Sequence, residues 1–69
     1  MEPATKRLID DAYQEAITEA IARGVSRLTA HKEAVTAAAM LLSALSGVED
    51  AQAKAEVVAL NLRPRADDE

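Results

Sequence analysis

The sequence predicts an all-α protein, in which two long helices form a hairpin and a short third helix follows. Apolar residues recur at spacings of three and four, as they do along one face of an α-helix. Sixteen alanines favour helix formation. The only two glycines, Gly24 and Gly47, stand where periodic segments end. At 69 residues the chain has room for one domain, which we expect to span residues 1–62.

The first helix is predicted over residues 3–23. Pro3 suits a first helical position, because its fixed φ is helical and its missing N–H would have been unpaired there. Gly24 is expected to end the helix in the left-handed conformation, with Val25 folding back onto Ala20 or Ile21. The predicted buried face consists of Ile9, Tyr13, Ala16, Ile17, Ala20 and Ile21.

The second helix is predicted over residues 26–46, the most apolar part of the chain, and Gly47 is its stop signal. Met40 and Leu41 widen an apolar face that is otherwise typical of an amphipathic helix. That face is expected to contain Leu28, Val35, Ala38, Ala39, Leu42 and Leu45.

The third helix is predicted over residues 48–61. Ser46 and Glu49 have the spacing of a capping box that would open it, and Pro64 prevents its continuation. Residues 63–69 are expected to form a disordered acidic tail. The predicted apolar face consists of Val48, Ala51, Ala55, Val58 and Leu62, with Val57 and Leu60 beside it.

A second arrangement also fits the pattern, because the apolar stripe continues in phase through Gly24. A single helix of about forty residues would then replace the hairpin, since glycine inside a helix costs only ~1 kcal/mol relative to alanine. The pattern favours the hairpin over this alternative.

The predicted core is thin, because alanines make up almost half of the apolar residues and each buries little more than one methyl group. Domains of this size are marginal without disulfides, metals or a partner subunit, and the chain contains no cysteine. We therefore expect a helical-bundle homodimer. Its expected dimer stripe consists of Ile9, Ile17, Ile21, Leu28, Val35, Leu42 and Leu45.

Charge is unevenly distributed along this chain of net charge −4. Residues 23–32, here named the basic joint, hold three bases and no acid. Like charges four residues apart destabilise a helix, so the rows Asp11, Glu15, Glu19 and Arg23, Arg27 call for an explanation. They are either solvated faces, or a contact in which the acidic row of one protomer lies beside the basic joint of its twin, or a docking surface. The candidate partner-binding residues are Tyr13, Arg23, Arg27, His31, Lys32, Asp11, Glu15 and Glu19.

No constellation of catalytic residues is recognisable. The single histidine, His31, lies near the apolar stripe, which is typical of a boundary histidine with a satisfied hydrogen bond. It has no second histidine or carboxylate four residues away to form a metal site. No glycine-rich phosphate loop or nucleophile elbow is present. We expect neither an enzyme nor a cofactor or metal.

The sequence favours a cytoplasmic protein. No cysteine is present, no secretory signal follows Met1, and the longest uncharged apolar run, 34–45, is shorter than the ~20 residues that a bilayer span requires.

The leading hypothesis is a homodimeric regulator or inhibitor that binds and modulates another protein. Short, acidic, alanine-rich helical chains of this kind are similar to accessory regulators of bacteria and their phages, such as inhibitors and antitoxins, although no shared motif carries the similarity. The alternative is a DNA-associated regulator, in which the basic joint belongs to a helix-turn-helix. The acidic balance and the lack of stacking aromatics disfavour it. A purely structural subunit is the third hypothesis.

Overall fold

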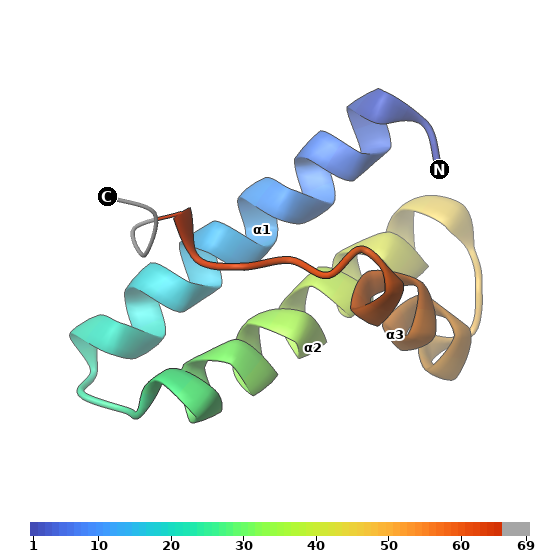
Figure 1. Cartoon of the computed structure of the whole chain (residues 1–69). Helices are drawn as coiled ribbons and strands as arrows, with labels where there is room; N and C mark the ends of the chain where they lie inside the picture. Colours follow the sequence, from blue (N-terminus) through green and yellow to red (C-terminus); the bar gives the residue numbers. More distant parts are fainter. Residues whose placement is uncertain (66–69) are drawn as a thin grey trace.

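The computed structural model describes residues 1 to 65, and within them it contains three α-helices and no strand. Helices α1 (Pro3–Ala22) and α2 (Arg27–Ser46) form an antiparallel hairpin, and α3 (Asp50–Ala59) turns back from the end of α2 with a bend of 117° (Figure 1). The prediction of three helices is confirmed. The alternative of one long helix is wrong, because the chain reverses at Gly24.

The reversal at Gly24 is a Schellman motif. Gly24 has a φ of +88°, and its N–H donates to the carbonyl of Ile21 at 2.9 Å, while the Val25 N–H donates to that of Ala20 at 3.3 Å. These two bonds satisfy carbonyls that the helix end would otherwise leave unpaired. Val25 packs against the core, as the sequence predicts.

Local capping also sets the limits of α2. The Ser26 side chain accepts a hydrogen bond from the Thr29 N–H at 3.2 Å, as an N-cap serine does. At the other end Gly47, with a φ of +75°, donates its N–H to the carbonyl of Ser43. The helix therefore ends where the sequence places its second glycine.

The predicted start of the third helix is wrong. The Ser46 hydroxyl donates back to the Leu42 carbonyl at 2.8 Å, and Glu49 occupies the N-cap of α3 without a side-chain capping bond. The connection is held instead by the Ser43 hydroxyl, which donates to the Val48 carbonyl at 2.7 Å. No capping box forms, and α3 spans Asp50–Ala59, so that it begins two residues later and ends two residues earlier than predicted.

The core lies between α1 and α2 and continues under α3. Its largest fully buried side chains are Tyr13, Ile9 and Val57. Most of the α2 contribution comes from alanine, so the helices approach closely with few large side chains between them. The buried residues are Ile9, Tyr13, Ile17, Ala20, Ala30, Ala34, Val35, Ala38, Ala39, Leu42, Ala53, Val57 and Leu62.

The expected dimer stripe divides into two sets. Ile9, Ile17, Val35 and Leu42 belong to the chain's own core. Ile21, Leu28 and Leu45 are exposed. The hairpin itself thus covers the larger part of the stripe.

The buried face of α3 also differs from the prediction. Ala53 and Val57 are buried, whereas Ala51, Ala55 and Val58 are exposed. Alternating alanines at 51, 53 and 55 fit either face of a helix equally well, so their spacing gives no orientation.

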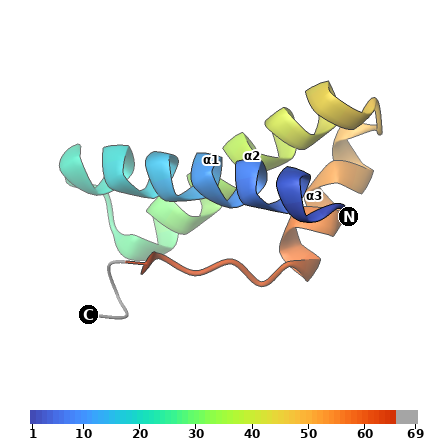
Figure 2. The same ribbon diagram turned by 90° about the horizontal axis from the view of Figure 1, so that it is seen from above.

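After α3 the chain returns along one side of the α1–α2 hairpin (Figures 1 and 2). Leu62 is buried in the core, and Arg63 and Arg65 form hydrogen bonds with α1. The predicted tail from 63 onwards therefore begins with three residues that lie against the fold. The rest of that predicted tail, residues 66–69, lies outside the described residues.

Candidate functional site

A pair of rings, the buried Tyr13 and the partly buried His31, joins α1 to α2. The Tyr13 hydroxyl lies 2.8 Å from Nδ1 of His31, and the rings meet edge to face with their centroids 5.6 Å apart. The tautomer of His31 decides which of these two atoms donates in the hydrogen bond. This pair confirms that His31 is a boundary histidine with a satisfied hydrogen bond.

Tyr13 is fully buried, so in the folded chain it does not lie on a surface that a partner can reach. Its aromatic ring and hydroxyl both serve the contact between α1 and α2. His31 is only partly buried, and it lines three shallow surface hollows.

A fourth hollow, which Met40 lines, lies beside these three, and together the four extend over α2, α3 and the C-terminal segment. Neighbouring hollows share lining residues: His31 and Arg63 line the first and second, Val35 and Val58 the second and third, and Lys32 and Thr36 the third and fourth. We name this surface the basic face. Its principal residues are Arg27, Leu28, His31, Lys32, Val35, Thr36 and Met40 of α2, Lys54 and Val58 of α3, and Arg63 and Pro64.

The basic face concentrates positive charge on an acidic protein. Four of the eight Lys and Arg residues of the chain line it, namely Arg27, Lys32, Lys54 and Arg63. The acid at its edge, Glu33, forms an ion pair with Arg23. Within residues 1 to 65, Lys32 and Lys54 form no ion pair, so their charges are available to a partner.

Exposed apolar side chains lie among these cations. Leu28, Met40 and Val58 are 63%, 66% and 59% exposed. Single exposed apolar residues are ordinary on a protein surface. Here three of them share one hollowed face with four cations, a combination that suits a partner offering both apolar and acidic groups.

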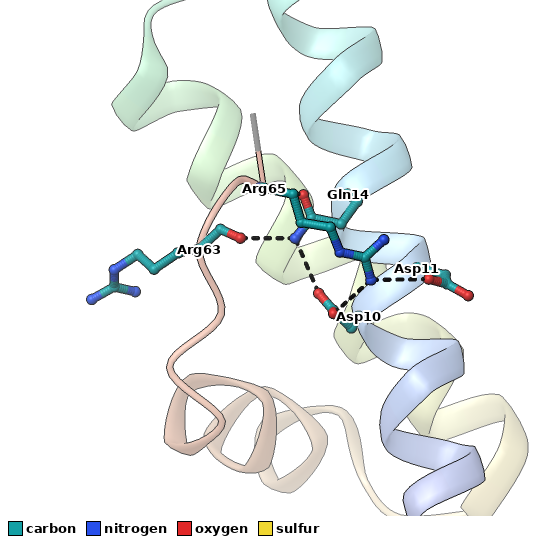
Figure 3. A network of polar contacts seen from close by, with 5 residues as sticks. All are labelled: Asp10, Asp11, Gln14, Arg63 and Arg65. Atoms are coloured by element: carbon teal, nitrogen blue, oxygen red, sulfur yellow. Dashed lines mark hydrogen bonds and ion pairs between the residues drawn. The ribbon is translucent and has the colours of Figure 1, made fainter. Parts of the chain in front are cut away.

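A network of polar contacts holds the C-terminal segment, the part of the basic face after α3, against α1 (Figure 3). We name this network the clasp; it consists of Asp10, Asp11, Gln14, Arg63 and Arg65. The Gln14 amide nitrogen donates to the Arg63 carbonyl at 2.8 Å, and the Gln14 amide oxygen accepts from the Arg65 N–H at 2.9 Å. The Arg65 guanidinium contacts Asp10 at 2.7 Å and Asp11 at 3.2 Å. The Arg63 side chain points away from the clasp (Figure 3), and it lines the basic face.

The clasp shifts the protonation of its charged groups. Partial burial by itself raises the pKa of Asp10. The hydrogen bonds from Gln14 and Arg65 and the positive charges of Arg65 and Lys6 lower it, and their combined effect is larger, so the pKa of Asp10 lies below its usual value. The hydrogen bonds from Arg65 to Asp10 and Asp11 raise the pKa of Arg65 in turn.

One residue of the acidic row, Asp11, and one of the basic row, Arg23, have ion-pair partners within the chain. Asp11 contacts Arg65, and Arg23 pairs with Glu33 across the hairpin. Neither Glu15 nor Glu19 lines the basic face, and both are exposed on α1. The structure thus brings Arg27, His31 and Lys32 together on one face and leaves the acidic row outside it.

Sequence reasoning missed the other half of the basic face. Lys54, Val58 and Arg63 join it only because α3 folds back on α2 and the clasp holds the segment beyond it. Lys54 and Arg63 carry no local pattern that marks them, and Val58 was assigned to a buried stripe.

Other kinds of site find no support among residues 1 to 65. No cluster of three or more His, Cys, Asp or Glu residues there could hold a metal ion. None of the three helices by itself has the length and apolar character that crossing a membrane requires. Comparisons of the chain with protein-family models, with curated proteins and with solved structures found no match, so its function has to be inferred from the basic face itself.

Proposed function

We propose that this protein is a non-enzymatic regulator or inhibitor that acts by binding another protein through the basic face. The observation that carries the proposal is the gathering of Lys32, Lys54 and exposed Leu28, Met40 and Val58 on one hollowed surface of an acidic chain. Protein interfaces commonly combine an apolar centre with charges that select the partner.

DNA binding through the same cations is the alternative. Half of the chain's Lys and Arg residues on one face support it. The apolar side chains between them do not, because phosphates and sugars gain little from contact with Leu28 or Val58. The protein-binding proposal accounts for both kinds of side chain.

The test is affinity capture from a host lysate with the wild-type protein and two charge-reversed variants. Lys32→Glu/Lys54→Glu alters the basic face, and Arg7→Glu is the control, since Arg7 is exposed on α1 and lines none of the four hollows. A protein retained by wild type and Arg7→Glu, and lost with the double variant at equal helicity, supports the proposal. A salt-sensitive DNA shift without protein capture supports the alternative, and equal capture by all three contradicts both.

We also propose a homodimer, formed away from the basic face. A two-fold interface places the same surface against itself, and two copies of the basic face would repel each other. Ile21 and Leu45, which are 46% and 52% exposed, are what remains of the expected stripe outside this face. Light scattering at micromolar concentration should show a dimer that Ile21→Lys weakens. A folded monomer at every concentration contradicts it.

A further inference from the structure

We propose that the ligand of the basic face is an acidic amphipathic helix of about three turns, supplied by a different protein. This inference depends on the proposed function and specifies the partner. It is argued from the dimensions of the face, from the positions of its apolar residues and from its charges.

The length comes from α2. Leu28 and Met40 line the hollows at the two ends of the face, twelve residues apart on α2, and they belong with Lys32 and Thr36 to one i,i+4 row that is inclined to the helix axis. At a rise of 1.5 Å per residue this corresponds to about 18 Å. A ligand helix of about twelve residues, or three turns, would cover it.

The shape comes from the two sides of the face. Val58 of α3 lines two hollows together with His31 and Val35 of α2, and Leu28 and Met40 line the hollows at the two ends. Apolar residues at positions i, i+4, i+7 and i+11 of a ligand helix form a stripe that fits such a trough. An extended peptide would gain no backbone pairing, because residues 1 to 65 contain no strand edge.

The charges come from both walls of the trough. Lys32 lies on the α2 side, Lys54 on α3 and Arg63 on the C-terminal segment. A ligand with Asp or Glu on both flanks of its apolar stripe would place carboxylates near each wall. Charge complementarity of this kind selects the partner and accelerates association.

The charges of the face and its lack of exposed Phe, Trp or Tyr side chains argue against two other ligands. A second copy docked two-fold through this face would oppose cation to cation. Single-stranded nucleic acid stacks on aromatic side chains, and the one aromatic residue, Tyr13, is buried.

The experiment uses three fluorescein-labelled 14-residue peptides and fluorescence anisotropy. The first is an amphipathic helix with Leu at positions i, i+4, i+7 and i+11 flanked by Glu, the second has Lys in place of every Glu, and the third is a scrambled form of the first. The first should bind, the other two at least tenfold more weakly. Lys32→Glu/Lys54→Glu should weaken binding of the first peptide at least tenfold, and Arg7→Glu less than twofold.

Failure of this inference can be separated from failure of the proposed function. If lysate capture depends on Lys32 and Lys54 but the acidic helix neither binds nor competes with the captured protein, the inference is overturned and the proposed function stands. Competition by the acidic helix, lost in the scrambled form, supports it. The inference is also overturned if a short DNA duplex, or a second copy of this protein, binds the basic face more tightly than the acidic helix does.

Discussion

Gln14 should be the residue on which the C-terminal wall of the basic face depends. Its side-chain amide makes two hydrogen bonds to the backbone of the segment, one to the Arg63 carbonyl and one from the Arg65 N–H. Alanine at this position removes both bonds and also the contact from Gln14 to Asp10. The Leu62–Arg65 segment should then detach more often from α1.

The expected magnitude follows from the exposure of these bonds. A hydrogen bond contributes about 0.5–1.5 kcal/mol to stability, and both bonds here are exposed, so Gln14→Ala should cost about 1–2 kcal/mol in total. For a domain of this size that lowers Tm by about 4–16 °C. Circular dichroism melts measure this shift, and hydrogen exchange of the Arg65 amide measures the local opening.

Gln52→Ala is the matched control. Gln52 is an exposed glutamine inside α3 whose side chain makes only a 3.5 Å contact with Glu56, and both substitutions gain the same few tenths of a kcal/mol of helix propensity. The difference between the two variants therefore isolates the clasp. Equal Tm values together with an unchanged exchange rate at Arg65 would refute the clasp.

Three further outcomes are expected. Ile9→Ala should cost about 2–5 kcal/mol in the free energy of unfolding, because Ile9 is fully buried, while the exposed neighbour Leu8 should tolerate alanine within about 0.5 kcal/mol; urea titrations compare them. Since the folded-state pKa of Asp10 is lowered from 3.8, its carboxylate stabilises the fold at pH values above 3.8, and this contribution should disappear as the pH falls through the lowered pKa. Asp10→Asn should therefore flatten the dependence of the unfolding free energy on pH in this acidic range, and an unchanged dependence argues against the clasp. Gly24→Ala should cost about 1–2 kcal/mol from its positive φ alone, as no atom lies within 4 Å of the added methyl, and a neutral effect in a thermal melt would contradict the Schellman turn.

The hairpin could be predicted because its signals are local. Pro3 at the start of α1, Ser26 at the N-cap of α2 and the two glycines at helix ends each act through the backbone of neighbouring residues. Such signals do not depend on what the helices pack against. The limits of α1 and α2 accordingly agree with the predicted limits to within one residue.

Features that depend on tertiary contacts could not be predicted in the same way. The Ser46 hydroxyl donates a hydrogen bond within α2 and does not cap α3. The loop between α2 and α3 sets the orientation of α3, and in that orientation Ala53 and Val57 face the core. Residues 63–65 looked like a tail because nothing in their sequence reveals that Gln14, 49 residues away from Arg63, holds their backbone.

The candidate site shows the same division. Arg27, His31 and Lys32 share one helix, so their grouping follows from spacing alone. Lys54 and Arg63 join them only through the 117° bend and the clasp. A search for charge clusters along the sequence would find the cations of α2 and would miss Lys54 and Arg63.

The thin core bears on the homodimer in a way that the sequence did not reveal. Its alanines, such as Ala34 and Ala38, are fully buried. Because their side chains are small, two helices can approach closely, and the dispersion contacts between the closely packed helices stabilise the hairpin although few large side chains are buried. Ile9, Ile17 and Leu42 then serve the hairpin and are not left for a twin. Of the expected stripe, only Ile21 and Leu45 remain exposed outside the basic face, so the proposed dimer would use few large side chains of that stripe and would leave the basic face open to a different protein.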